Sequence, residues 1–318
     1  MWFVFSVICI LGWGLADLFY KQGSASNDRY SHLKIAVWVG LVMGVCSVCL
    51  LPFCESSFSA DTFFRNLIAY LPASLGYILS MVIGYAGMRY LEISIVSPVQ
   101  NASGALSALC ILCWFLLTGR GQSIADVLSS PVLIALFLIV SGVIALAVTE
   151  QRLSRNEKKL APEEKKYRFG ALALIFPLLY CVFDTLGTAA DGIILSEEGG
   201  LDLGEIDVLV LYGLTFLLFG IAAFIFLRIK TGTYYNPFRK SERSKGIAAL
   251  CEEFGQVFYV YAMARQPILA APLVASYCIL SVLLSRIFMK EKLTKAQYLC
   301  VLPVLIGIVL LGLFDSGE

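Results

Sequence analysis

Charged residues and histidine are scarce in this chain of 318 residues. Asp, Glu, Lys and Arg make up only 15% of it, and His32 is the one histidine. A soluble protein usually has about 25% charged residues, so the composition excludes a soluble enzyme and a disordered tail. A lone histidine at a loop end argues against a histidine-based metal site and against a Ser-His hydrolase. No glycine-rich phosphate-binding loop followed by Lys and Ser or Thr is present, which excludes nucleotide hydrolysis as an energy source.

The chain also has little net charge. Its 24 Lys and Arg residues nearly balance 23 Asp and Glu residues, which leaves a formal charge of +1. No overall field attracts a polyanion, so no nucleic-acid partner is expected. The pairs Cys46/Cys49 and Cys110/Cys113 have a spacing found in zinc modules. Each pair lies in an apolar segment without a histidine nearby, so we expect these cysteines to pack as small apolar residues, with no metal and no cofactor.

Apolar residues are abundant instead: they make up 59% of the chain, and its mean hydropathy is +0.82. A membrane-spanning helix needs about 20 consecutive apolar residues. The sequence predicts an all-α, multi-pass membrane protein, in the plasma membrane, with ten transmembrane helices joined mostly by short linkers. The predicted spans are Met1–Tyr20, Leu33–Pro52, Leu67–Met88, Ile93–Thr118, Val127–Thr149, Phe169–Leu195, Val208–Ile229, Ile247–Ala264, Ile268–Met289 and Gln297–Phe314.

The first segment and two linkers have features of their own. The first segment lacks a basic start and a small-residue cleavage site and carries Asp17 in its second half, so we expect a permanent helix rather than a signal peptide. Glu150–Arg168 and Lys230–Gly246 are the long linkers. Both are rich in Lys and Arg and are predicted to be solvated loops.

Basic residues alternate between the predicted loops. All of them except Arg65, Arg120 and Arg265 lie in or next to the odd-numbered loops. Cytoplasmic loops are enriched in Lys and Arg, so this pattern places the odd loops in the cytoplasm and both termini outside. The sixth loop is instead acidic, with Glu197, Glu198, Asp202, Glu205 and Asp207.

The two halves of the chain resemble each other. Tyr85-Ala86 near the end of the third span matches Tyr261-Ala262 in the eighth, and Pro98 and Pro272 follow early in the next spans. Two units of five helices must have opposite orientations, as in the inverted repeats of secondary transporters. The sequence therefore predicts a first repeat at residues 1–149, a basic linker at 150–168 and a second repeat at 169–318.

These motifs resemble a known family. The stretch Arg286–Thr294, followed by Gln297 and Leu305–Leu311, resembles the end of the second EamA repeat of the drug/metabolite transporter superfamily. Gly12-Trp13-Gly14 resembles part of the first repeat, as does the region from Tyr85 to Pro98. Residues 118–121 depart from the Glu-containing turn of that family. The resemblance implies a ten-helix carrier of amino acids, nucleotide sugars, amines or drugs. It also implies cytoplasmic termini, opposite to the charge pattern, so both orientations stay open.

Several predicted spans carry ionisable residues, which are costly in hydrocarbon and usually face a bundle interior. Asp17 shares a helix face with Trp13, although it could instead pair with Lys21 near the membrane surface. Asp184 falls in the middle of the sixth span on one stripe with Tyr180. Asp191 lies on the same stripe but close to the acidic loop, where we expect it to be solvated.

Two further helices present polar stripes. One face of the eighth span carries Glu252, Gln256 and Tyr259. This face could line a cavity, or its glutamate could pair with Lys245 or Arg243. Gln100 and Asn101 follow Pro98 in the fourth span, where polar and small residues suit either a cavity or ordinary helix packing. Ser276 and Tyr277 occupy the related place after Pro272. Aromatic residues on these faces could belong to interfacial belts or attract a cation.

The strongest interpretation is a secondary active transporter, not an enzyme, for a small cationic or zwitterionic solute. Interior carboxylates outnumber deep basic groups, and a desolvated carboxylate can exchange a proton with such a solute. Asp17, Asp184 and Glu252 are the candidates for proton coupling. The alternative is a non-transporting scaffold or lipid-binding protein. Membrane lipids are expected partners, and a monomer and a homodimer stay open. The predicted substrate-binding residues are Trp13, Asp17, Gln100, Asn101, Tyr180, Asp184, Glu252, Gln256, Tyr259, Ser276 and Tyr277.

Overall fold

The computed structural model describes residues 1–24, 28–54, 60–88, 90, 93–119, 130–160, 175–196, 203–289 and 294–315. Throughout these ranges the regular structure is helical, with no strand. The α-helices are α1 (Trp2–Gly23), α2 (Ser31–Leu50), α3 (Ala60–Gly87), α4 (Ile93–Gln100), α5 (Ser103–Thr118), α7 (Ser130–Leu160), α8 (Ile175–Leu195), α9 (Glu205–Thr231), α10 (Arg243–Arg265), α11 (Pro267–Ala275), α12 (Tyr277–Phe288) and α13 (Lys295–Asp315). Short 3₁₀ turns lie at Leu51–Phe53 and Lys240–Glu242.

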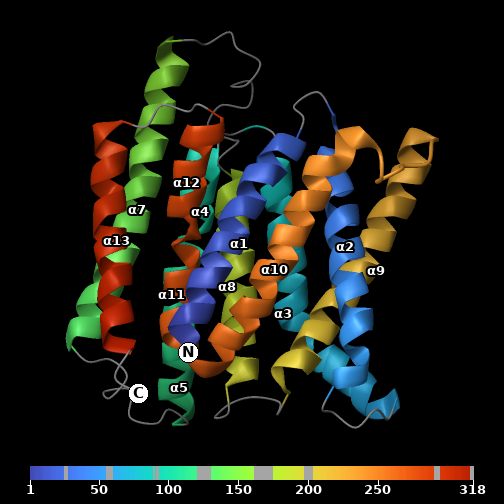
Figure 1. Ribbon diagram of the computed structural model, residues 1–318, viewed down its shortest axis with the longest axis horizontal. Helices are drawn as coiled ribbons and strands as arrows, with labels where there is room; N and C mark the ends of the chain where they lie inside the picture. Colours follow the sequence, from blue (N-terminus) through green and yellow to red (C-terminus); the bar gives the residue numbers. More distant parts are fainter. Residues whose placement is uncertain are drawn as a thin grey trace.

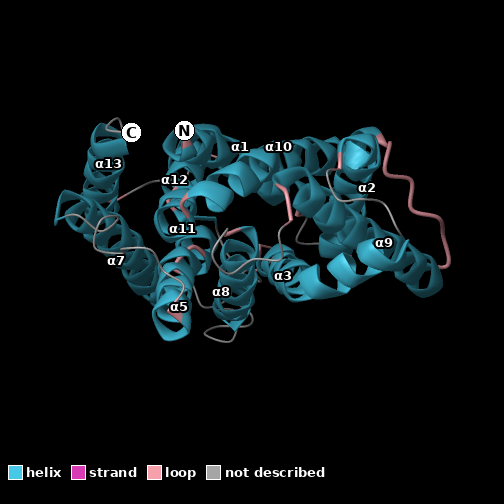
Figure 2. Ribbon diagram, turned by 90° about the horizontal axis from the view of Figure 1, so that it is seen from below, coloured by secondary structure: helices cyan, strands magenta, loops and turns pink. Residues whose placement is uncertain are grey.

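The helices form a bundle of two layers (Figure 2). One layer holds α13, α12, α1, α10 and α2, and the other holds α7, α5, α8, α3 and α9. Two of the closest helix pairs join the layers at the ends of the bundle, α2 with α9 and α7 with α13 (Figure 1). The other two lie within a layer, α1 with α10 and α3 with α8. Each layer therefore combines helices from both halves of the chain.

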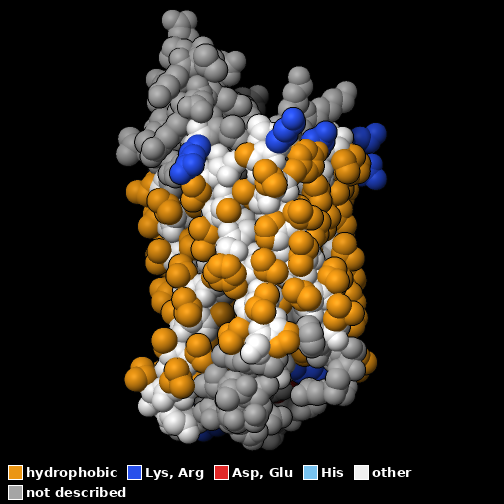
Figure 3. All heavy atoms as spheres, turned by 90° about the vertical axis from the view of Figure 1, so that its left-hand side faces the viewer, with side chains coloured by type: hydrophobic (Ala, Val, Ile, Leu, Met, Phe, Trp, Pro, Cys, Tyr) orange, Lys and Arg blue, Asp and Glu red, His pale blue; other side chains and the backbone are white. Residues whose placement is uncertain are grey.

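On the face shown in Figure 3, apolar side chains form a band, and Lys and Arg gather mainly along its upper edge. Six helices of the described residues are long and apolar enough to cross a membrane. Their bounds are Trp2–Gly23, Ser31–Phe53, Asp61–Gly87, Ile175–Leu195, Glu205–Thr231 and Pro267–Phe288. The fold and this surface define an integral, multi-pass membrane protein.

The other four predicted spans differ from uniform apolar helices for identifiable reasons. The fourth is divided into α4 and α5, and the apolar stretches Ser103–Thr118, Ser130–Leu146 and Lys295–Leu310 are short. The predicted eighth span lies within α10, which carries two glutamates and a glutamine in its middle, Glu252, Glu253 and Gln256. The polar residues of α10 lower its hydropathy while the apolar helices around it supply the packing.

The two long linkers are shorter than predicted. Helix α7 continues to Leu160, so residues 150–160 are helical rather than a loop, and residues 161–168 lie outside the described part. At the other linker α9 ends at Thr231 and α10 begins at Arg243. Lys, Arg and Glu are good helix formers, so these helices extend beyond their apolar segments. Arg89, Arg120, Glu197, Glu198 and Asp202, used in the loop-charge pattern, also lie outside the described residues.

Glycine pairs bring helix backbones together near the middle of the bundle. A β-carbon built on Gly12 of α1 would lie 2.9 Å from Cα of Gly255 on α10, and one on Gly76 of α3 would lie 2.8 Å from Cα of Gly187 on α8. Gly40 of α2 meets Gly220 of α9 in the same way, at 2.8 Å. Small residues allow such close approach between membrane helices. These contacts fix the positions of the helices that surround the centre.

Candidate functional site

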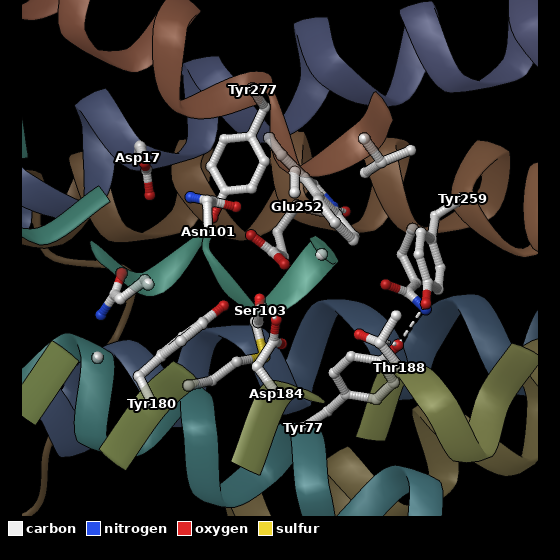
Figure 4. Close-up of a pocket in the computed structure, with 18 of the residues that line it drawn as sticks. Asp17, Tyr77, Asn101, Ser103, Tyr180, Asp184, Thr188, Glu252, Tyr259 and Tyr277 are labelled. Carbon is white, nitrogen blue, oxygen red and sulfur yellow. Dashed lines mark hydrogen bonds between the residues drawn. The ribbon is translucent and has the colours of Figure 1, made fainter. Parts of the chain in front are cut away.

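A polar cavity lies between the two layers, where helices of both halves of the chain meet (Figure 4). Its volume is about 50 Å³, which is room for a few water molecules or one small chemical group. Among the described residues that line it, none is Lys, Arg or His, whereas three carry carboxylates. The lining consists of Trp13, Asp17, Tyr20, Tyr77, Met81, Gly84, Tyr85, Met88, Gln100, Asn101, Ser103, Gly104, Tyr180, Asp184, Thr188, Tyr212, Glu252, Gln256, Tyr259, Ala271, Val274, Ala275 and Tyr277.

Asp17 of α1 connects three helices at one side of the cavity. Its side chain is buried (5% exposed), and its Oδ2 atom accepts hydrogen bonds from the hydroxyl of Ser97 on α4 at 2.7 Å and of Ser281 on α12 at 2.8 Å. The structure does not contain the alternative surface pair of Asp17 with Lys21, because Asp17 is buried and accepts hydrogen bonds from these two serines. A carboxylate with hydroxyl partners is held in place but keeps its charge available to a cation.

Asp184 of α8 and Glu252 of α10 face each other across the centre. The Ser103 hydroxyl donates a 2.6 Å hydrogen bond to Oδ2 of Asp184, and Ser103 is the first residue of α5. The positive end of the α5 dipole favours a carboxylate there. Glu252 points toward Ser103 and Asp184 (Figure 4). Lys245 donates to Glu242 at 2.6 Å, so the alternative pairing of Glu252 with Lys245 is not observed.

Two helix interruptions border the cavity. The fourth predicted span breaks between Gln100 and Ser103, and the ninth breaks at Ser276. Proline weakens the helical hydrogen-bond ladder, and each break follows a proline, Pro98 or Pro272, by a few residues. Broken helices offer ends that carry partial charge, and transporters use such ends beside bound solutes.

An aromatic wall closes one side of the cavity. The ring of Trp13 lies 5.1 Å from that of Tyr259 and 5.7 Å from that of Tyr277, measured between centroids. The indole N–H of Trp13 donates to the backbone carbonyl of Glu252 at 3.2 Å, which fixes the ring. Ring faces attract cations, and this wall stands next to the carboxylates.

Two side-chain amides at the cavity have N–H donors without an acceptor among the described residues. The Nε2 atoms of Gln100 and Gln256 are buried and have no hydrogen-bond partner in the described part of the chain, and both residues line the cavity. An unmade hydrogen bond of a buried donor costs about 1–3 kcal/mol. A solute with an acceptor oxygen or nitrogen would remove this cost, so the amides complement the carboxylates.

All the residues predicted to bind substrate line the cavity except one. Ser276 is buried at the helix break, but its hydroxyl donates to the Leu273 carbonyl at 2.6 Å and it is not part of the lining. The sequence analysis missed Tyr77, Thr188 and Tyr212, which also line the cavity. Tyrosines are expected near membrane interfaces, so a tyrosine in the middle of an apolar span was the signal that could have found Tyr77. Tyr212 lies near the start of its span, where this signal is absent.

The prediction for Asp191 was wrong. This residue is fully buried (0% exposed) rather than solvated, and it accepts a hydrogen bond from the Tyr70 hydroxyl at 2.9 Å. The reason is the packing of α8 against α3, which covers this end of the stripe with tyrosine rings.

Comparisons with known proteins agree with this architecture. Residues 198–313 match the model of the EamA-like transporter family, which confirms the predicted resemblance to the EamA-type family of the drug/metabolite transporter superfamily. Among curated proteins none matches the chain. A solved structure titled "Crystal structure of protein" aligns with a TM-score of 0.61 at 12% sequence identity, covering 98% of this chain and 96% of that one. At this identity the likeness shows the fold alone.

Proposed function

We propose that the protein is a secondary transporter that moves a small organic cation, or a zwitterion held by its ammonium group, across the plasma membrane by alternating access. The observation that carries this proposal is the central cavity, whose described lining residues include three carboxylates and an aromatic wall but no basic side chain. Such a site attracts positive charge and repels anions. Asp17, Asp184 and Glu252 would bind the cationic group and exchange it with protons.

We further propose that ten spans form two inverted five-helix repeats, at residues 1–149 and 169–318. The packing supports this. In such a repeat α8, α9 and α10 are the counterparts of α1, α2 and α3, so the contact of α1 with α10 corresponds to the contact of α8 with α3, and the contact of α2 with α9 corresponds to itself. The glycine contacts follow the same correspondence. Gly12 with Gly255 becomes Gly187 with Gly76, and Gly40 with Gly220 is its own counterpart.

The cavity in this conformation is too small for most metabolites. Sites for drug-sized ligands measure about 300–1,000 Å³, compared with about 50 Å³ here. The helices must therefore separate to admit a solute, as a transporter requires. A scaffold has no use for a polar centre in its membrane region, so the cavity favours transport over the non-transporting alternative.

Purified protein tested for thermal stabilisation by amines, amino acids and nucleotide sugars would identify the class of solute. We expect amines or cationic amino acids to raise the melting temperature and anionic nucleotide sugars to leave it unchanged. Uptake of the best compound would then be measured in proteoliposomes. Stabilisation only by nucleotide sugars, or pH-dependent uptake that is unchanged when Asp17→Asn and Asp184→Asn are combined, would overturn the proposal.

A further inference from the structure

A second buried carboxyl group lies outside the cavity. Asp191 of α8 is fully buried and does not belong to the cavity lining. The Tyr70 hydroxyl donates to its Oδ1 atom at 2.9 Å, and the Tyr77 hydroxyl lies 3.5 Å from its Oδ2 atom. None of the ion pairs between described residues involves Asp191. The carboxyl group thus has phenol donors but no cationic partner.

Asp191 lies between the cavity and one end of the bundle. It precedes the end of α8, Leu195, by four residues, or about 6 Å along the helix. On the other side the Tyr77 oxygen lies 3.2 Å from the Thr188 hydroxyl oxygen and forms a hydrogen bond with the Tyr259 hydroxyl. Tyr77, Thr188 and Tyr259 all line the cavity. A continuous set of hydrogen bonds therefore connects Asp191 with the cavity and joins α3, α8 and α10.

The surroundings of Asp191 contain no described basic group that could neutralise it. Gly192, next in the chain, packs against apolar Ile111, Met263 and Pro267. Arg65 of α3 is exposed, and Arg265 of α10 bonds Glu205 and the Tyr261 carbonyl. The titratable groups that bond Asp191 or contact those that do are Tyr70 and Tyr77 of α3, Tyr259 of α10 and Tyr212 of α9, which packs on Tyr77. Asp184 lies about two turns away on α8 itself.

We propose that Asp191 is a proton-binding site, separate from the substrate cavity, whose occupancy is coupled to closing the cavity toward the acidic loop that joins α8 and α9. The inference rests on the proposed transport function. Opening on this side must break the bonds from Tyr70 and Tyr77 and bring water to the carboxyl group, which favours its charged form. Closing removes the water and leaves only neutral phenol donors, which stabilise the charge less than water does, so the protonated form is favoured. The proton passes from Asp191 to water on the acidic side when the gate opens and returns when it closes.

The test needs no transported substrate. The full-length protein, with its native cysteines replaced and Gln100→Cys as a reporter inside the cavity, is placed in liposomes. A membrane-impermeant thiol reagent is added on the acidic-loop side. Asp61→Cys, at an exposed position near the start of α3, gives the reagent's own pH dependence and the orientation of the protein. We expect the corrected labelling rate of the cavity cysteine to rise with pH, by up to about tenfold per pH unit for a single coupled proton.

Two variants separate the proton site from a merely structural contact. Asp191→Asn should give slow labelling that no longer depends on pH. Tyr70→Phe keeps the acid but removes a bond of the closed gate, so it should label several-fold faster while keeping the pH dependence. A pH dependence that survives in Asp191→Asn, or is lacking in the parent protein or in Tyr70→Phe, would overturn the proposal. Failure of the cation-transport proposal would be distinguishable. In that case the parent protein would take up no amine or amino acid, but its labelling would still depend on pH.

Discussion

Gly12 on α1 and Gly255 on α10 touch backbone to backbone, so closely that a β-carbon on Gly12 would lie 2.9 Å from Cα of its partner. Gly76 and Gly187 repeat this contact between α3 and α8 at 2.8 Å. In the proposed inverted repeat the two pairs would involve equivalent helices, and they set the spacing of the helices that carry Asp17, Asp184 and Glu252.

Gly12→Ala and Gly76→Ala should each destabilise the protein by about 1–3 kcal/mol, because the added methyl group meets backbone atoms that cannot move away. Melting temperature in detergent is the measurement. Ala222→Val, which adds bulk at an exposed position of α9, is the control and should change little. Equal stability of Gly12→Ala and the control would contradict the close contact.

Asp17→Asn and Asp184→Asn should each weaken binding of a stabilising amine by about 10- to 100-fold, because each removes a charge-assisted interaction of about 1.5–3 kcal/mol. Isothermal titration of purified protein would measure this. Glu205→Gln removes a carboxylate that bonds Arg265 at the end of the bundle, and its affinity should match that of the parent. If all three variants bound alike, the cavity carboxylates would not hold the cation.

A cysteine at position 100 should react with a water-soluble thiol reagent once the cavity opens, and a bound amine should slow this reaction, because Gln100 lines the cavity. Mass spectrometry after timed labelling would show it. Ile139→Cys, at a fully buried apolar position, should stay unlabelled with or without the amine. Labelling at position 100 that is indifferent to every stabilising compound would place the binding site elsewhere.

Asp28 lies in the connection between α1 and α2, outside the spans, and forms an ion pair of 2.7 Å with Lys34 in the first turn of α2. Partial burial alone would raise the pKa of Asp28, but hydrogen bonds from Lys34 and the Tyr30 N–H and the Lys34 charge lower the pKa below 3.8. Because the pKa of Asp28 is lower in the folded state than in the unfolded state, the charged side chain stabilises the folded protein above the unfolded-state pKa. This stabilisation is lost as the pH falls through the folded-state pKa. Asp28→Asn should therefore lower stability at pH 7 by less than about 1 kcal/mol, and by progressively less as the pH falls below the ordinary pKa of an aspartate.

Melting temperatures across this pH range would check the Asp28 prediction. Glu205→Gln, which removes the other surface carboxylate of an ion pair, serves as the comparison. A cost of Asp28→Asn that persisted unchanged at low pH would show that the side chain acts through packing rather than charge.

The sequence analysis located much of the site because ionisable residues in apolar spans are rare and costly. Asp17, Asp184 and Glu252 could be recognised from that rule alone, and the structure brings them to one cavity. Ser97, Ser103 and Ser281 could not be recognised as their partners, because serine is common in membrane helices and which one meets a carboxylate depends on the rotation of separate helices.

The prediction of the spans was limited by the same physics. Hydropathy reports how apolar a segment is, so it identifies α1 and α9 readily, but α10 owes its place to its neighbours rather than to its own composition. Asp191 was misassigned because distance from a loop along the chain does not reveal that Tyr70 and Tyr77 of another helix cover the carboxyl group.

The glycine contacts near mid-height have a mechanical consequence. Two uncrossed rods that touch at one central point can rock about it: when their ends part on one side, their ends on the other side come together. If α1 with α10 and α3 with α8 tilt about Gly12–Gly255 and Gly76–Gly187, a single rocking movement would part the helices at one membrane face while pressing them together at the other. A continuous leak would then be prevented by geometry, without a separate lock at each face.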